Sequence, residues 1–403
     1  MSEFHRYNEA LLASVKRIEE SCELSKRDKQ LILGFKEDCV IRGLGKPRII
    51  KYLSVLPSFA SRLGKELDQV TLPDIQRLVS YIQQQNYSVW TKHGYKVMLK
   101  RFYKWLYPSE DGSYPKLVSW IKNNIMRSQL PLPAEGDLFT EEDIKKLIET
   151  AEHPRDKALV AVLWESGCRV GEIGTLKLKN VAMDKYGMIL HVFGKTGSRS
   201  IRIIFATPYL STWLNNHPLK NDRENSLWVN IGNVNHHQPV QYANIRKVLQ
   251  DLFRKAGISK KANPHMFRHS RATFLANYLT EFQMNQYFGW VQGSEMPATY
   301  VHMSGKAIDS ALLTLYGLKP QEKNQKILEP RQCPRCETLN NHDSKYCNKC
   351  SGILDLKLAM EMEQETKEYE EKRVNKDQLM DILLKDPQVQ ELLIRKMKIL
   401  ANS

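Results

Sequence analysis

Six polar residues whose side chains suit chemistry at a phosphodiester follow one another in a fixed order along the middle of this chain. In chain order they are Arg169 in E-S-G-C-R-V-G-E-I, Lys195 in F-G-K-T-G-S-R-S-I-R-I, His265 and Arg268 in H-M-F-R-H-S-R, Trp290 in Y-F-G-W and Tyr300 in A-T-Y-V-H-M-S. Each short motif is weak evidence, because an H-x-x-R pair or a lysine in a glycine-rich turn is common. The ordered set is much more specific than any of its parts.

Each residue type offers something different to a phosphodiester. Guanidinium groups match the non-bridging oxygens, and two of them beside a tyrosine favour its phenolate form, which can attack phosphorus. Histidine can accept the phenol proton or hydrogen-bond the phosphate, lysine on a hairpin tip can protonate the leaving oxygen, and an indole N–H can donate to developing charge. These cations make a metal unnecessary, so we expect no catalytic cofactor. The sequence also lacks the phosphate-binding pattern GxxxxGK[ST].

The ordered set resembles the tyrosine recombinases, or integrase family, closely over residues 141–318 and loosely over the preceding part of the chain. The resemblance places all six residues on the family's motif positions, with Trp290 where histidine is more frequent, and it adds Glu172 as a supporting acid. It implies an enzyme that breaks and rejoins DNA as a site-specific recombinase or integrase, through a 3′-phosphotyrosyl intermediate.

In the implied mechanism Tyr300 attacks the scissile phosphate and frees a 5′-hydroxyl. Arg169 and Arg268 hold the phosphate, while the remaining roles are proton transfer by His265, orientation by Trp290 and protonation of the leaving oxygen by Lys195. Strand exchange requires two duplexes. The implied partners are therefore double-stranded DNA and a homotetramer assembled on it, with a monomer or dimer off DNA.

The charge balance independently favours a polyanionic partner. The 403 residues include 60 Lys and Arg against 45 Asp and Glu, for a formal net charge of +15. A surplus of this size is typical of nucleic-acid-binding proteins and exceeds what an acidic small substrate requires. The length predicts about two or three domains.

Nothing in the sequence predicts export or membrane insertion. The opening M-S-E-F-H-R-Y-N-E-A is polar, and no run approaches the roughly 18 apolar residues of a membrane span. Cys22, Cys39 and Cys168 have no regular spacing and are typical of reduced core residues. We therefore expect a cytoplasmic, nucleoid-associated protein with no membrane partner.

Residues 1–127 are expected to form an all-helical domain, because apolar residues recur at helical spacing, as in Ile49, Leu53, Leu56, Phe59 and Leu63. Thr71 with Asp74 and, further on, Ser88 are expected to cap helices. The resemblance identifies this region as a SAM-like core-binding domain that clamps DNA. The helix after Ser88 has a basic stripe made of Lys92, Lys96, Lys100, Arg101 and Lys104. Such a stripe is usually solvated surface, but beside a polyanion we predict phosphate contacts.

A linker is expected at residues 128–137, S-Q-L-P-L-P-A-E-G-D, because its prolines and glycine prevent either helix from continuing. It would lead into a catalytic domain at residues 138–320, which opens with a helix capped by Thr140 and Asp143. Gly167 is expected to end the helix that precedes Arg169. The β-rich runs 188–193 and 200–205 flank Gly194-Lys195-Thr196-Gly197 and predict a hairpin with the lysine at its tip.

Further helices are expected at residues 207–217 and 241–256. Asn263 is expected to cap a helix that carries His265 and Arg268 on one face, near a helix N-terminus that favours anions. Thr280 is expected to cap the helix before Trp290. Tyr287 and Tyr278 are the rival nucleophiles, and the resemblance favours Tyr300.

Residues 329–352 contain two C-x-x-C motifs with ten residues between them, a strong pattern for tetrahedral zinc. The expected ligands are Cys333, Cys336, Cys347 and Cys350. The segment resembles a small zinc ribbon, and a structural zinc would supply its folding free energy. A redox pair or disulfides are the alternatives, and whether the segment contacts DNA, protein or only its neighbours stays open.

Residues 353–403 are expected to form a charged helical tail. Residues 361–372 are rich in acids and predict a solvated helix. A second helix starts at Asp386-Pro387, with an apolar face formed by Val389, Leu392, Leu393, Met397 and Leu400. That face needs a partner, either the body of this chain or a neighbouring protomer, and we favour a protomer.

The sequence therefore predicts a multidomain, mainly α protein. It would combine an all-helical SAM-like core-binding domain, a mixed α+β tyrosine-recombinase catalytic domain with a small antiparallel sheet, a small zinc ribbon and a helical tail. Two other functions remain open. A type IB topoisomerase-like nicking–closing enzyme would use the same chemistry without a partner duplex, and a non-catalytic DNA-binding regulator would keep the fold without needing the six-residue set.

Overall fold

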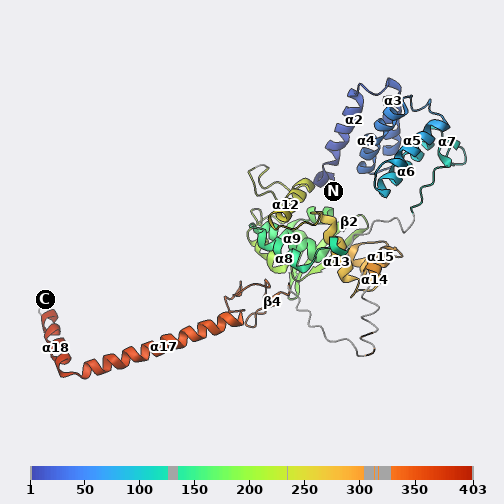
Figure 1. Ribbon diagram of the computed structural model, residues 1–403. Coiled ribbons are helices and arrows are strands. Elements are labelled where there is room, and N and C mark those ends of the chain that lie inside the picture. The colour runs from blue at the N-terminus through green and yellow to red at the C-terminus, as the bar shows by residue number, and fades with distance from the viewer. Residues whose placement is uncertain are drawn as a thin grey trace.

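The computed structural model describes residues 2–125, 135–233, 235–303 and 328–401, together with residues 313 and 316. Figure 1 shows a helical N-terminal domain, a second domain of helices with a small sheet, and a pair of C-terminal helices that projects away from both. Most of the predicted linker lies outside the described residues, and Glu135–Asp137 at its end forms a 3₁₀ turn. The last part of the predicted catalytic domain, from residue 304 to 320, is likewise outside them apart from Leu313 and Tyr316.

The N-terminal domain is helical, as the sequence predicts. Its helices are α1 (Ser2–His5), α2 (Tyr7–Glu20), α3 (Lys26–Ile41), α4 (Lys46–Leu63), α5 (Leu72–Gln84), α6 (Val89–Leu106) and α7 (Lys116–Ser119). The apolar positions predicted on α4 lie in the core, with buried side chains at Ile49, Leu53, Leu56 and Phe59. Thr71 and Asp74 form the predicted capping box of α5, and Ser88 caps α6.

Helix α1 packs on the core of the second domain, although it lies in the N-terminal part of the chain. Phe4 is 6% exposed and belongs to the core cluster of the second domain. Its ring packs against Gly174, where a Cβ atom would overlap the ring, and lies edge-on to the Tyr242 ring at 6.2 Å. The two domains are thus connected by a buried aromatic contact as well as by the chain.

The second domain contains helices on both sides of a long, buried central helix. Its elements are α8 (Glu141–Thr150), α9 (Pro154–Ser166), α10 (Val170–Gly174), β1 (Val181–Asp184), β2 (Gly187–Gly194), β3 (Gly197–Ile203), α11 (Thr207–Asn215), α12 (Tyr242–Lys255), α13 (Pro264–Leu275), α14 (Glu281–Phe288) and α15 (Met296–Met303). Every residue of α9 from Ala158 to Ser166 is buried, as expected for a helix that is covered all round.

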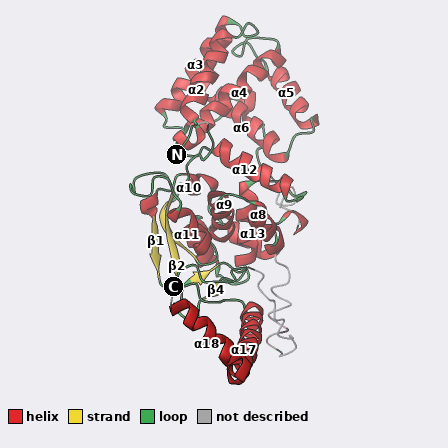
Figure 2. Cartoon of the chain, turned by 90° about the vertical axis from the view of Figure 1, so that its left-hand side faces the viewer, coloured by secondary structure: helices red, strands yellow, loops and turns green. Residues whose placement is uncertain are grey.

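The predicted hairpin forms, and a third strand joins it. The antiparallel sheet has the order β1-β2-β3, and Gly194 pairs with Gly197 so that Lys195 and Thr196 make the turn. Figure 2 shows β1 and β2 side by side at one edge of this domain. Strand β1 was not predicted, because three of its four side chains are exposed and no alternation marks it.

The predicted helix ends are also confirmed. Thr140 and Asp143 form the capping box of α8, and Gly167 ends α9 with a φ of 55°, a left-handed conformation that glycine adopts readily. A Cβ at Gly167 would also lie 2.8 Å from the Phe288 ring, so the position has little room for a side chain. Asn263 caps α13, and Thr280 forms a capping box on α14.

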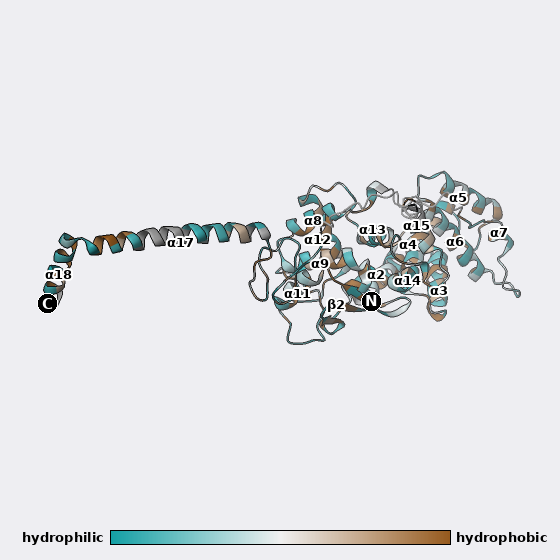
Figure 3. Cartoon of the chain, turned by 90° about the horizontal axis from the view of Figure 1, so that it is seen from below, coloured by the Kyte–Doolittle hydropathy of each residue, from teal (hydrophilic) through white to brown (hydrophobic). Residues whose placement is uncertain are grey.

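The C-terminal part begins with a two-stranded ribbon, β4 (Arg331–Gln332) and β5 (Leu339–Asn340), which holds the cysteine motifs. Two helices follow, α17 (Leu356–Lys385) and α18 (Pro387–Ala401). The second starts at Asp386-Pro387 as predicted, and the Asp386 carboxylate caps it by accepting from the Gln388 backbone N–H. Figure 3 shows α17 extending far from the body of the chain, with apolar residues gathered towards its far end.

Candidate active site

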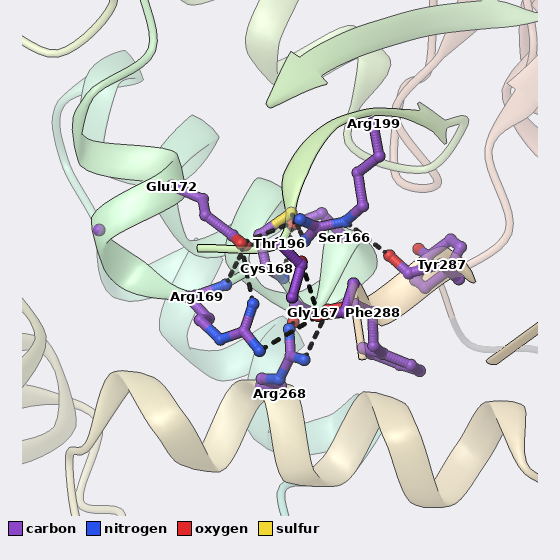
Figure 4. A network of polar contacts seen from close by, with 12 residues as sticks. Ser166, Gly167, Cys168, Arg169, Glu172, Thr196, Arg199, Arg268, Tyr287 and Phe288 are labelled. Carbon is purple, nitrogen blue, oxygen red and sulfur yellow. Dashed lines mark hydrogen bonds and ion pairs between the residues drawn. The ribbon is translucent and has the colours of Figure 1, made fainter. Parts of the chain in front are cut away.

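The first arginine motif lies at the centre of a network of polar contacts (Figure 4). Arg169 is the N-cap residue of α10. The carboxylate of Glu172, which is 2% exposed, accepts hydrogen bonds from the Arg169 backbone N–H at 2.9 Å and from its guanidinium at 3.1 Å. The same carboxylate accepts from both terminal nitrogens of Arg199, at 2.9 and 2.7 Å. Burial opposes ionisation, but these hydrogen bonds and charges lower the pKa of Glu172.

The second arginine reaches the same place from α13. Arg268 is 6% exposed and donates to the carbonyl oxygens of Gly167 at 3.2 Å and Phe288 at 2.7 Å. Its guanidinium carbon lies 5.3 Å from the centroid of the Trp290 ring, within cation–π range. Burial first, and then the charge of Arg169, lower the pKa of Arg268 to about 10. The group therefore remains a cation at neutral pH.

Three consecutive carbonyl groups at the end of α14 bind the arginine side chains. The last carbonyls of a helix have no partner within it and carry partial negative charge, so cations are favourable there. The Tyr287 oxygen accepts from Arg199 Nε at 2.9 Å, the Phe288 oxygen from Arg268, and the Gly289 oxygen from Arg169 at 3.3 Å and Thr196 Oγ1 at 3.0 Å. This helix end thus connects α10, α13 and the β2–β3 hairpin.

Tyr300 lies against the same turn. Its ring is parallel to that of Trp290, with centroids 5.5 Å apart and planes at 4°. Its hydroxyl oxygen is 2.7 Å from Nδ1 of His269, the residue that follows Arg268 on α13. Tyr300 is only 2% exposed, in a small cluster with Ala272 and other apolar side chains. The structure therefore brings this tyrosine to the histidine and arginine motif, but with its hydroxyl covered.

Two expectations about this tyrosine differ from the structure. Burial raises the pKa of Tyr300 to about 12, although the charge of Arg268 opposes the rise. The expectation that the Tyr300 hydroxyl ionises more easily is therefore wrong for this conformation. Desolvation of the hydroxyl raises its pKa by more than the charge of the Arg268 guanidinium lowers it. The histidine that contacts the hydroxyl is His269, whereas the sequence favoured His265 for proton transfer.

The other two predicted residues stand at the rim. His265 keeps an exposed edge, and desolvation of its ring, followed by the charges of Arg268 and Arg169, lowers its pKa. Lys195 is exposed at the hairpin tip, and none of the described residues forms a hydrogen bond or ion pair with it. The rivals to Tyr300 are poorly suited as nucleophiles in this structure. The Tyr287 hydroxyl donates to the Glu165 carbonyl at 2.9 Å, and Tyr278 is 68% exposed and outside the network.

Sequence reasoning missed the importance of Arg199 and treated His269 only as a neighbour. A signal for each was present. Arg199 precedes the buried Ile201 and Ile203 at intervals of two on β3, so its side chain lies on the same, covered face of the strand. A charged group on that face needs a partner. His269 follows His265 by four residues, which places both on one face of α13.

The comparisons with known proteins agree with this geometry. Residues 137–306 match the family model described as "Phage integrase family". Tyrosine recombinase XerA of Pyrococcus furiosus is 27% identical over 219 residues, which are 54% of this chain and 71% of that protein. Tyrosine recombinase XerC of Pelotomaculum thermopropionicum is 26% identical over 277 residues, 63% of this chain and 85% of that protein. The chain is a tyrosine-type recombinase.

Solved structures show the same fold at low sequence identity. The XerH site-specific recombinase bound to palindromic difH substrate superposes with a TM-score of 0.54 at 18% identity, covering 78% of this chain and 98% of that one. A lambda integrase tetramer bound to a Holliday junction gives a TM-score of 0.51 at 14% identity, over 72% and 87% of the two chains. Among the described residues of this recombinase, no helix is long and apolar enough to span a membrane.

The basic stripe of the recombinase lies on α6, and three of its lysines already bind carbonyl oxygens of their own domain. These contacts join Lys92 to Gln83 at 2.7 Å, Lys100 to Ile121 at 3.0 Å and Lys104 to Gly112. An ammonium group has three N–H donors, so each lysine keeps donors for another acceptor. The contacts fix the direction of these side chains, whereas Arg101 is exposed beside them. Contact of the stripe with DNA stays a prediction.

The four cysteines of the C-terminal ribbon come together as their spacing predicts. The sulfur atoms of Cys333, Cys336, Cys347 and Cys350 all lie within 4.8 Å of one another, and two of the pairs are 3.5 Å apart. Zinc–sulfur bonds of about 2.3 Å in a tetrahedron place sulfurs about 3.8 Å apart, so the arrangement fits a Cys₄ metal site. The ribbon also contacts the catalytic domain, because His342 Nδ1 lies 3.2 Å from the Tyr209 hydroxyl on α11.

The tail of the recombinase leaves its predicted apolar face exposed. On α18, Leu392 is 64%, Leu393 42% and Met397 68% exposed, and the side chain of Leu400 is not described. Leu379, Ile382 and other apolar residues near the end of α17 are exposed as well. The body of this chain does not cover these described side chains, so it is not their partner in this structure. Packing on a neighbouring protomer stays a prediction.

Proposed function

We propose that this recombinase cuts and rejoins double-stranded DNA at a specific site, with Tyr300 as its nucleophile. The tyrosine oxygen forms a bond to the scissile phosphorus while the bond to the 5′ oxygen breaks. The product is a 3′-phosphotyrosyl link and a free 5′-hydroxyl. A 5′-hydroxyl from another strand reverses the step, so the energy of the phosphodiester is retained and no nucleotide is consumed.

The observation that carries this proposal is the convergence on the end of α14. Arg169, Arg268 and the hairpin of Lys195 come from separate elements, yet all contact the carbonyls that precede Trp290. Trp290 in turn stacks on Tyr300. A phosphate placed beside the two guanidiniums would therefore lie close to the Tyr300 ring, and uncovering its hydroxyl would give the arrangement that covalent phosphoryl transfer needs.

We assign the roles from the chemistry of each group. Arg169 and Arg268 hold the phosphate, because each keeps guanidinium N–H donors beyond those bound to carbonyls. Lys195 protonates the departing oxygen from the exposed hairpin tip, and His265 hydrogen-bonds the phosphate at the rim. His269 accepts the phenol proton, because it is the base in contact with Tyr300.

The nucleophile must move before it can react. Tyr300 is 2% exposed, so its oxygen cannot meet a phosphate of a duplex while the ring lies covered against Trp290. We infer that DNA binding uncovers the hydroxyl, while His269 stays within reach of it and the arginine network keeps its arrangement. This separates the movable nucleophile from the preorganised cations.

The DNA complex is proposed to contain four copies of the chain, because strand exchange joins two duplexes. A tetramer on a Holliday junction is the state named for the lambda integrase structure with the same fold. The net charge of +15 and the basic stripe on α6 favour phosphate contacts over the length of each half-site. The exposed apolar residues of α17 and α18 are proposed to pack on a neighbouring protomer.

Zinc is proposed as a structural ion of the C-terminal ribbon. Cys333, Cys336, Cys347 and Cys350 would bind it as thiolates and close the ribbon, which is too short to fold alone. These cysteines lie outside the network around Tyr300, so an ion bound there would take no part in the proposed chemistry.

A trapping experiment tests the nucleophile. The full chain is incubated with a library of duplexes that carry randomised sequence around a nick, placed a few nucleotides on the 3′ side of the scissile position. Cleavage then releases a short fragment that diffuses away, and the covalent adduct accumulates. We expect a denaturation-resistant adduct whose DNA sequences converge on one site and whose modified peptide contains Tyr300.

The matched variants are Tyr300→Phe and Tyr278→Phe. The first should form no adduct, and the second should behave like the parent because Tyr278 is exposed and outside the network. An adduct on another residue, or one that survives Tyr300→Phe, contradicts the proposal. Relaxation of supercoiled plasmid without any sequence preference would instead favour a nicking–closing enzyme.

A further inference from the structure

Arg199 lies at the centre of the polar network, away from the solvent-exposed rim where His265 and Lys195 lie. Its side chain is 10% exposed. The two terminal nitrogens grip both oxygens of Glu172, Nε donates to the Tyr287 carbonyl at 2.9 Å, and one nitrogen lies 3.8 Å from the Cys168 sulfur. These contacts use the guanidinium fork on protein groups, so little of it remains for a phosphate.

The contacts of Arg199 join the hairpin to two other elements. Glu172 belongs to α10 and also binds Arg169, while the Tyr287 carbonyl ends α14. The hydroxyl of Thr196, next to the hairpin lysine, donates to the Gly289 carbonyl at 3.0 Å, two residues beyond Tyr287. The approach is close, because a Cβ at Gly194 would overlap the Glu172 carboxylate. The base of the hairpin is therefore fixed on both sides, four residues from Lys195.

We propose that Arg199 is a positioning residue that sets the place of Lys195 at the scissile phosphate. The side chain of Lys195 has no partner among the described residues, so the position of the hairpin sets the region that its ammonium group can reach. Arg199 fixes that position by clamping β3 onto Glu172 and onto the end of α14. The inference rests on the proposed function, in which Lys195 protonates the leaving 5′ oxygen.

A sulfur substitution in the DNA separates this role from a merely structural one. The substrate is the duplex recovered by trapping, with sulfur in place of the 5′-bridging oxygen at the scissile phosphate. Attack by Tyr300 then breaks a phosphorus–sulfur bond and releases a thiolate. A thiol has a pKa of about 8.5, so the thiolate leaves without a proton from lysine, whereas an alcohol does not.

Single-turnover cleavage rates are compared on the oxygen and sulfur duplexes for Arg199→Ala and Arg199→Lys. We expect Arg199→Ala to slow cleavage of the oxygen duplex by about 100-fold, the cost of a misplacement of about 1 Å. On the sulfur duplex the loss should shrink to within about threefold. Arg199→Lys should lie between, because it keeps the charge but loses the bidentate fork. It also serves as the test variant if Arg199→Ala does not fold.

Arg202→Ala is the matched control. Arg202 lies on the same strand and forms a similar two-bonded pair with Asp184, at 2.8 and 2.7 Å, but on the exposed side of the sheet. It should cleave both duplexes at the parent rate.

Lys195→Ala distinguishes the inference from the function on which it rests. If the sulfur duplex restores Lys195→Ala but not the Arg199 variants, Arg199 acts as a general structural support and the inference is wrong. If the sulfur duplex fails to restore Lys195→Ala, the acid role itself is wrong and the inference falls with it. An unfolded fraction would lower both rates equally, so it cannot imitate the expected selective rescue.

Discussion

Removal of the His269 imidazole is the sharpest perturbation that the structure suggests for the nucleophile. Nδ1 of His269 lies 2.7 Å from the Tyr300 oxygen, and burial, followed by the charges of His265 and Arg268, lowers the pKa of His269. The ring is therefore neutral at pH 7 and can accept a proton. We predict that His269→Ala slows adduct formation strongly and changes its dependence on pH.

The size of the effect follows from the burial of the phenol. A pKa of about 12 for Tyr300, against an ordinary value of 10.0, corresponds to about a hundredfold less phenolate at neutral pH, or about 2.7 kcal/mol. Free phenolate is thus too rare to be the main attacking species in this environment. A positioned base that takes the proton during attack contributes about 10²–10⁴-fold, and this is the loss expected for His269→Ala.

The assay is single-turnover adduct formation on the trapped duplex between about pH 5 and pH 9. The lowered pKa of His269 means that the neutral, active form predominates above its ordinary value of 6.5 and is lost as pH falls through the lowered value. The parent rate should therefore be constant above pH 6.5 and fall at lower pH. His269→Ala should be slow throughout and lack this acidic limb.

Two comparisons make the result decisive. His265→Gln should keep the acidic limb, because the pKa of His265 is also lowered but His265 has no contact with the phenol. His191→Ala should leave the rate unchanged, since His191 makes a similar 2.9 Å contact with a hydroxyl, that of Ser200, on an exposed strand. A His269→Ala variant that cleaves within about threefold of the parent, with the same acidic limb, would refute the assignment.

Three further predictions follow from other contacts. Glu172→Gln should lower the free energy of unfolding by about 3–5 kcal/mol in urea titrations, because it leaves the buried Arg199 without a counter-charge; the exposed Glu149→Gln should change it by less than about 1 kcal/mol. Gly174→Ala should displace the Phe4 ring from the catalytic core and speed tryptic cleavage after Arg6, whereas unchanged cleavage would mean that the contact is not maintained in solution. Chelation should remove about one zinc per chain and lower the Tm. Cys347→Ala should purify with little zinc and show no further loss of Tm on chelation, and a parent protein that binds no zinc would exclude the metal site.

Features that depend on nearby residues in the chain were predictable from the sequence. The capping box of Thr140 and Asp143, the glycine turn at Gly167 and the two-residue turn at Lys195 each follow from local backbone chemistry. The cysteine spacing likewise brought four sulfurs together. The resemblance to the recombinase family added the roles expected of the six ordered residues, which local rules do not supply.

Features that depend on packing were not predictable in the same way. The covered position of Tyr300 arises from Trp290 and from α13, which lie elsewhere in the sequence. The same applies to the stripe on α6, where Lys100 reaches the carbonyl of Ile121, 21 residues away. A pattern of residue types gives the groups available to a site. The tertiary structure decides which groups satisfy one another and which remain for a ligand.

The end of α14 explains how so many cations can be held together before DNA arrives. Arg169 and Arg199 bind the one carboxylate of Glu172. Its charge favours the protonated form of the nearby Arg268, whereas the charge of Arg169 disfavours it. The three carbonyls that end the helix offset this repulsion, because they supply partial negative charge without adding an anion. The site therefore keeps a net positive charge that a phosphate can neutralise. An acidic side chain in place of those carbonyls would have reduced the attraction for DNA, so the backbone is the better counter-charge for a group of arginines that must bind a phosphodiester.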